Sequence, residues 1–191
     1  MNRSSKQGKL VVISGPSGVG KSTICRQVVQ RLDATLSVSA TTRPRGAAET
    51  DGQEYYFLSP DEFRRRIAAG AFLEYAEVFG HYYGTPREPV QQAVAAGKIV
   101  ILEIDVQGGL QVKAKWPEAM MVFILPPQPE VLLQRIEARA RGEDRQARQN
   151  RLARAEAEIA TGKADYAYFV VNDVLDKAVQ DVIDIIEQKT E

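Results

Sequence analysis

The sequence has little of what several protein classes require. Its 191 residues include one cysteine, Cys25, so no disulfide can form within the chain, and we expect a buried thiol. No run approaches the roughly 18 apolar residues of a membrane-spanning helix. Twenty-five Lys and Arg residues balance 25 Asp and Glu residues, so no net positive field draws the chain to nucleic acid. We therefore expect neither a membrane nor a nucleic-acid partner.

The N-terminal residues 1–8, MNRSSKQG, also lack something, namely the apolar segment of a secretion signal. We expect a disordered tail over 1–8, one domain over 9–191, and a cytoplasmic protein. The oligomeric state stays open. With 44% hydrophobic residues, the chain can bury a sizeable core.

Five apolar runs predict strands: KLVVIS, LSVSA, IVILEID, MMVFIL and YFVVN. Strands that are apolar almost throughout are buried on both faces, which predicts an α/β fold with a parallel sheet flanked by helices. Helices are expected at 21–31, 129–140 and 174–189, and another begins after the capping residue Ser59. Residues from about 37 to 96 are expected to form an inserted subdomain of mixed α/β structure, with strands at 55–58 and 72–79. The core then comprises residues 9–36 and 97–191.

The string GPSGVGKS, residues 15–22, matches G-x-x-x-x-G-K-[ST] and lies between a predicted strand and a predicted helix. Backbone N–H groups of such a loop surround a polyphosphate, the lysine reaches the terminal phosphates, and the Ser22 hydroxyl can bind Mg²⁺. A plain glycine turn would need neither Lys21 nor Ser22. The predicted ATP site comprises Gly15, Pro16, Ser17, Gly18, Val19, Gly20, Lys21, Ser22 and Thr23.

Two further segments carry charge in a suggestive place. The strand IVILEID ends in Glu103 and Asp105, where a phosphate-loop enzyme places acids near Mg²⁺ and substrate. Asp105 is the first choice for such a role, and the alternative is that it caps a helix or a turn. The segment RARGEDRQARQN breaks the apolar rhythm and predicts a lid over about 138–152. Its arginines could also cover a solvated helix or bind nucleic acid, but no aromatic residues are interleaved with them.

Several strings occur together in one order: SVSATTRPR, GQEYYF, LEYAEVFGHYYGT, LEIDVQG and VND. Behind the intact phosphate loop, this combination resembles guanylate kinase across nearly the whole chain. The resemblance implies a P-loop NTPase fold and direct transfer of the γ-phosphoryl group of ATP to GMP or dGMP, with Mg²⁺. Because the acceptor phosphate is already an oxygen nucleophile, no general base is needed, and His81 is expected in a surface turn.

The resemblance also implies roles for single residues. Guanine offers two N–H donors and the O6 acceptor, so its pocket needs a carboxylate beside a hydroxyl, which suits Glu74 and Thr85. Thr85 stands where the family often has serine, and TTRPR is one residue shorter than the family's usual TTRxPR. The expected GMP-binding residues are Ser39, Arg43, Arg45, Tyr55, Glu74, Tyr83, Thr85 and Asp105. Catalytic roles are expected for Lys21, Arg43, Asp105, Arg135, Arg139 and Arg151, and Asn172 is expected at adenine.

Two other functions stay possible at this stage. A catalytically inactive interaction module of the same fold would show a degraded phosphate loop, whereas this loop is complete. A kinase of another phosphorylated small molecule would not need the guanine-facing set of Ser39, Glu74 and Thr85.

Overall fold

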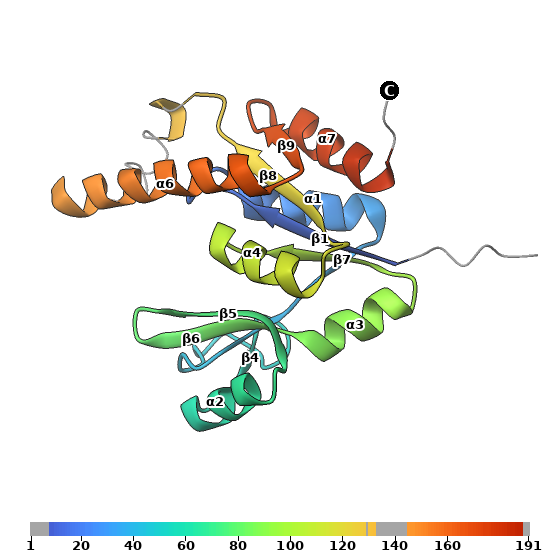
Figure 1. Cartoon of the computed structure of the whole chain (residues 1–191), viewed down its shortest axis with the longest axis vertical. Coiled ribbons are helices and arrows are strands. Elements are labelled where there is room, and N and C mark those ends of the chain that lie inside the picture. The colour runs from blue at the N-terminus through green and yellow to red at the C-terminus, as the bar shows by residue number, and fades with distance from the viewer. Residues whose placement is uncertain (1–7, 129, 133–144, 189–191) are drawn as a thin grey trace, which may run out of the picture.

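A computed structural model describes residues 8–128, 130–132 and 145–188, the last range without the side chains of 145–152. It contains two sheets with helices packed around them (Figure 1). The larger sheet is parallel and lies between helices, so the α/β prediction is confirmed. Among the described residues, no helix is both long and apolar enough to cross a membrane.

The larger sheet has the strand order β2-β7-β1-β8-β9, and every neighbouring pair is parallel. Its central strands β1, β7 and β8 are buried almost throughout, as their apolar sequences predict. The strands are β1 (Lys9–Ser14), β2 (Thr35–Leu36), β7 (Ile99–Glu103), β8 (Met120–Leu125) and β9 (Tyr168–Val171). Their carboxyl ends meet at one edge, where parallel α/β sheets bind ligands.

The smaller sheet is mixed, with the order β4-β3-β6-β5. It consists of β3 (Ser39–Thr41), β4 (Tyr55–Phe57), β5 (Phe72–Val78) and β6 (His81–Pro86), all within the range expected for the insertion. The run LSVSA was expected to be one strand but divides between the two sheets. Its Leu36 ends β2 and its Ser39 begins β3, because the chain leaves the larger sheet after Ser37 N donates to Ile101 O.

Helices cover both faces of the larger sheet. On one face lie α1 (Lys21–Leu32), which buries Cys25 as predicted, and α7 (Leu175–Glu187). On the other lie α3 (Arg87–Ala95) and α4 (Val106–Lys115). In the smaller sheet, α2 (Pro60–Ala68) begins where Ser59 Oγ accepts from Glu62 N at 3.2 Å, as its capping sequence predicts.

The long helix α6 (Arg145–Asp165) overturns part of the expected break in the chain. Residues 145–150 were expected outside a helix because they lack apolar spacing, yet they form its first turns. Arg, Gln and Ala are good helix formers without any apolar stripe. The earlier part of the expected lid, 138–144, lies outside the described residues, as does most of the helix predicted at 129–140.

Candidate active site

The phosphate loop joins β1 to α1 and is held in shape by its glycines and its lysine. Gly20, at the N-cap of α1, has φ of 101°, and a Cβ there would lie 2.5 Å from Asn172 Nδ2. Lys21 Nζ donates to Gly15 O at 2.5 Å and to Pro16 O at 3.1 Å. Burial lowers the pKa of Lys21, and the Glu103 carboxylate opposes that shift. The ammonium group therefore lies across the mouth of the loop.

Asn172 follows β9 and supports this loop from the far end of the chain. It is 7% exposed, and its Nδ2 donates to Val19 O at 2.8 Å. The sequence places Asn172 at adenine, whereas the structure brings its amide to the backbone of the phosphate loop. The hydrogen bond joins residues 153 positions apart.

Acidic side chains at the end of β7 face the loop. Ser22 Oγ donates to Glu103 Oε1 at 2.5 Å. Asp105 is the N-cap of α4, because its Oδ1 accepts from Gly108 N at 2.8 Å, while its Oδ2 lies 3.7 Å from Arg154 Nη2. Asp105 thus caps a helix with one oxygen and directs the other toward α6. In the parts of the chain that the structure describes, no cluster of three metal-binding side chains occurs.

A cavity of about 350 Å³ opens between the phosphate loop, α6 and the smaller sheet. It is lined by Gly15, Ser17, Lys21, Phe79, Asp105, Arg154 and Glu158. Arg154 Nε also donates to Glu158 Oε1 at 3.0 Å, one helical turn away. The loop lysine and Asp105 therefore line one cavity.

A buried acid and hydroxyl pair lies where β5 and β6 pair in the smaller sheet. Thr85 Oγ1 donates to Glu74 Oε1 at 2.6 Å, and the residues are 1% and 7% exposed. Burial raises the pKa of Glu74, although the Thr85 hydrogen bond opposes the shift. A Cβ at Gly108 would lie 3.0 Å from Glu74 Oε2, so glycine there leaves room for the carboxylate. The pair expected for guanine is therefore assembled between β5, β6 and the start of α4.

Thr85 also lines a smaller cavity of about 140 Å³ with Ser39, Tyr55 and Glu103. Ser39 comes from β3, Tyr55 from β4 and Glu103 from β7, so the cavity lies between the two sheets. It brings together three of the side chains that the sequence assigns to GMP. The hydroxyl groups of this set come from three different strands of the smaller sheet.

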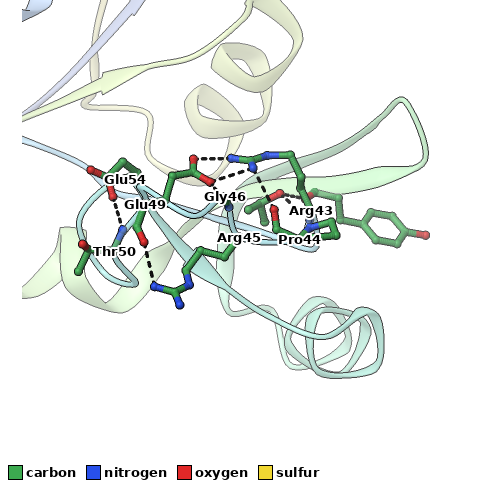
Figure 2. A network of polar contacts seen from close by, with 9 residues as sticks. Arg43, Pro44, Arg45, Gly46, Glu49, Thr50 and Glu54 are labelled. Carbon is green, nitrogen blue, oxygen red and sulfur yellow. Dashed lines mark hydrogen bonds and ion pairs between the residues drawn. The ribbon is translucent and has the colours of Figure 1, made fainter.

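Two of the residues expected to hold the acceptor phosphate, Arg43 and Arg45, contact Glu49 (Figure 2). Arg43 Nη2 and Nη1 donate to its two carboxylate oxygens at 2.7 and 2.9 Å, and Arg45 Nη1 donates to its backbone oxygen at 2.9 Å. The Arg43 guanidinium also lies 5.5 Å from the centroid of the Tyr55 ring, which meets the Tyr83 ring edge to face. The Arg43 hydrogen bonds lower the pKa of Glu49 to about 2.

A family model described as guanylate kinase matches residues 7–189. The chain belongs to the guanylate kinase family. A guanylate kinase of Thermosynechococcus vestitus is 52% identical over 174 residues, which are 90% of each chain. One of Synechocystis sp. is 46% identical over 190 residues, which are 98% of each.

A solved structure agrees with this guanylate kinase assignment. The crystal structure of guanylate kinase from Anaplasma phagocytophilum has a TM-score of 0.74 and 30% identity, covering 96% of this chain and 87% of that one. A gluconokinase from Sinorhizobium meliloti shares the fold alone, with a TM-score of 0.51 at 14% identity.

The guanylate kinase motifs do not reveal every residue of the site. No role was assigned to Glu49 from the sequence. The available signal was its position at the end of GAAE, which places an acid shortly after the arginines of the shortened TTRPR. His81 was expected in a turn but is the first residue of β6, since the turn is one step earlier at Phe79 and Gly80. Arg135 and Arg139 lie outside the described residues, and Arg151 is described only as part of α6.

Proposed function

We propose that the chain binds ATP on the phosphate loop and GMP between the two sheets, with residues 37–96 as the GMP-binding insertion. As a member of the guanylate kinase family, it phosphorylates GMP with ATP. The observation that carries the residue-level proposal is the buried pair of Glu74 and Thr85. A carboxylate withdrawn from water is costly unless a ligand or neighbour supplies donors, and guanine supplies two.

Guanine recognition follows from this pair. The Glu74 carboxylate would accept from the N1 and exocyclic N–H groups, while the hydroxyls of Thr85 and Ser39 serve the rest of the base edge. Adenine has no N1 proton and carries an amine in place of O6, so it would leave the buried carboxylate without partners. Neither interaction involves the ribose 2′-hydroxyl, so dGMP should also be accepted.

The phosphate of GMP would bind to Arg43, Arg45, Tyr55 and Tyr83. Guanidinium and phenol groups donate hydrogen bonds to a phosphate without taking a proton from it. The packing of the Arg43 guanidinium on Tyr55 supports a clamp whose cation is already oriented.

On the ATP side, backbone N–H groups of 15–23 would surround the β- and γ-phosphates, and Lys21 would move from the loop carbonyls to bridge them. Asn172 would hold the loop and border the adenine site. Arg139 and Arg151, within the lid of about 138–152, and Arg135, shortly before it, would approach the γ-phosphoryl group. Because ATP and GMP are cytoplasmic metabolites, we infer that the protein acts there.

Mg²⁺ fits the donor set beside the loop. Ser22 Oγ and Glu103 Oε1 are oxygen donors in contact with each other, which suits an ion that takes few protein ligands and binds mainly phosphates and water. Bound there with ATP, Mg²⁺ would neutralise charge on the phosphate oxygens.

The transfer would be a direct displacement. A phosphate oxygen of GMP forms a bond to the γ-phosphorus, and the bond to the β–γ bridging oxygen breaks to release ADP. Lys21 and the lid arginines would stabilise charge on the transferring group, and Asp105 would orient the acceptor. Positioning and charge stabilisation supply the catalysis.

An ADP-release assay over GMP, dGMP, AMP, CMP and UMP tests the function. We expect turnover with GMP and dGMP and almost none with the others. Lys21→Ala should abolish most turnover while circular dichroism stays unchanged, because the loop backbone remains. Near-normal turnover of that variant would contradict the phosphate-loop assignment, and efficient use of AMP would contradict the guanine pocket.

A further inference from the structure

Phe79 is placed where an aromatic side chain gains nothing from packing. It lies at the tip of the β5–β6 hairpin and is 98% exposed. The other large apolar residues that the structure describes as exposed keep between 37% and 60% of their surface open. An isolated exposed phenylalanine has no stabilising role in the fold.

The backbone conformation of Phe79 is also unfavourable for a phenylalanine. The hairpin closes between Val78 and His81 through a two-residue turn, with φ of 51° at Phe79 and 77° at Gly80. Positive φ at both positions is typical of a type I′ turn, whose first position favours Asn or Gly. A bulky side chain is strained there, so the sequence departs from its own turn chemistry at this one residue.

The turn places Phe79 at the edge of the cavity that the phosphate loop also lines. Phe79 lines the cavity of about 350 Å³ that also contains Lys21, Asp105 and Arg154. The lining residues other than Phe79 are glycine or polar. Figure 1 shows the β5–β6 hairpin and α6 extending toward the same side of the molecule, one from each sheet layer. A strained, exposed aromatic residue thus lies at the opening of the space where the two substrates react.

We propose that Phe79 is a positioning residue that covers the phosphate cleft and keeps water from the γ-phosphoryl group. This inference rests on the proposed transfer from ATP to GMP. In the competing reaction, a water oxygen bonds to the γ-phosphorus, the bond to the β–γ bridging oxygen breaks, and ADP, inorganic phosphate and a proton are released. An apolar ring at the opening disfavours the entry of that water, and it needs no charged group to do so.

The test separates turn chemistry from function. Phe79→Asn gives the turn its preferred residue, so the melting temperature should rise. The rate of GDP formation should nevertheless fall about tenfold, and phosphate released per GDP formed should increase by a similar factor. Phe79→Leu, which keeps an apolar side chain at the same backbone position, should retain a ratio near that of the wild type.

Both products are measured in the same reaction, with ATP, Mg²⁺ and GMP present. An unchanged phosphate-to-GDP ratio in Phe79→Asn would overturn the proposal. A change in oligomeric mass together with an unchanged phosphate-to-GDP ratio would also overturn it, because the ring would then be a contact between copies of the chain. Failure of the wild type to form GDP would instead contradict the proposed function, so the two failures are distinguishable.

Discussion

At the residue scale, the Glu74 carboxylate faces opposing demands from stability and recognition. It is 7% exposed and accepts one hydrogen bond from Thr85, so its charge is poorly solvated. The same withdrawal from water is what allows a carboxylate to reject a base that lacks matching donors. We therefore expect variants at Glu74 to change binding and stability in opposite directions.

Glu74→Gln should lower kcat/KM for GMP about 100-fold, because an amide donor then faces a guanine donor. The KM for ATP should hardly change. Steady-state kinetics with the four ribonucleoside monophosphates measure this, and Glu77→Gln, an exposed position on the same strand, is the control. A Glu74→Gln variant that prefers GMP as strongly as the wild type would move guanine recognition to another residue.

The same variant should be more stable than the wild type at pH 7. Burial raises the pKa of Glu74 above its ordinary value of 4.5, so at pH values between these two the folded state binds a proton that the unfolded state has lost. Wild-type stability therefore falls as pH rises from 4.5 through the raised pKa. Denaturant unfolding between pH 4 and 8 should show the advantage of Glu74→Gln shrinking toward acid. An advantage independent of pH would contradict the raised pKa.

Glu49→Gln tests how far the phosphate clamp depends on its acid. The carboxylate fixes Arg43 with two hydrogen bonds, and glutamine can supply only one acceptor. The KM for GMP should rise about tenfold, with kcat less affected and the KM for ATP unchanged. Glu62→Gln is a control, because the Glu62 carboxylate also pairs with arginine, namely Arg65 and Arg66, but on α2. Equal effects of both variants would mean that Glu49 only stabilises its loop.

Side-chain chemistry explains which residues could be predicted from the sequence. Guanine itself specifies a carboxylate and a hydroxyl, so Glu74 and Thr85 follow from the ligand once the family is suspected. Glu49 acts through Arg43 and touches no expected substrate atom, so no ligand chemistry points to it. Asn172 illustrates a third case, because an amide after a strand can face a ligand or a backbone carbonyl with equal ease.

At the element scale, α4 and the end of α6 are joined by a buried polar chain. Tyr166 Oη donates to Ser14 Oγ at 2.7 Å, and Ser14 Oγ donates to Asp105 O at 3.3 Å. Burial raises the pKa of Tyr166 to about 12, so its hydroxyl remains a donor. This chain of hydrogen bonds runs from the end of α6 to Asp105, the residue that we propose to orient the acceptor.

Gly109 in α4 makes room for that chain, since a Cβ there would lie 1.8 Å from Tyr166 Oη. Gly109→Ala should lower the free energy of unfolding by about 1–3 kcal/mol through overpacking. In a Tyr166→Phe background the same change should cost less, because the hydroxyl is gone. Urea unfolding of the two single variants and the double variant measures the coupling. Strictly additive effects would exclude the close approach.

Elements that are apolar throughout were predictable, as β1, β7 and β8 show. The division of LSVSA between two sheets was not, because a run of five residues contains no mark of where a chain changes sheet. The helical start of α6 was missed for a different reason. Its first residues favour helix through intrinsic propensity, and apolar periodicity cannot detect that.

At the scale of the whole molecule, the phosphate loop is held by Asn172, a residue from a distant part of the chain. Asn172→Ala removes the hydrogen bond to Val19 O and the amide that packs on Gly20. The KM for ATP should rise about tenfold, while that for GMP should stay near the wild-type value. Asp173→Ala, at the exposed neighbouring position, serves as the control. A larger effect on GMP than on ATP would contradict this role.

The strand order of the larger sheet has a consequence for biosynthesis. In chain order β1 precedes the other strands of this sheet and occupies its middle, and its partners β7 and β8 begin only at Ile99 and Met120. An emerging chain therefore exposes an apolar strand without partners while the smaller sheet, made entirely from residues 39–86, can already pair. We expect a nascent chain to be a chaperone substrate until β8 has been made, and to acquire ATP affinity only after β9 delivers Asn172 to the loop.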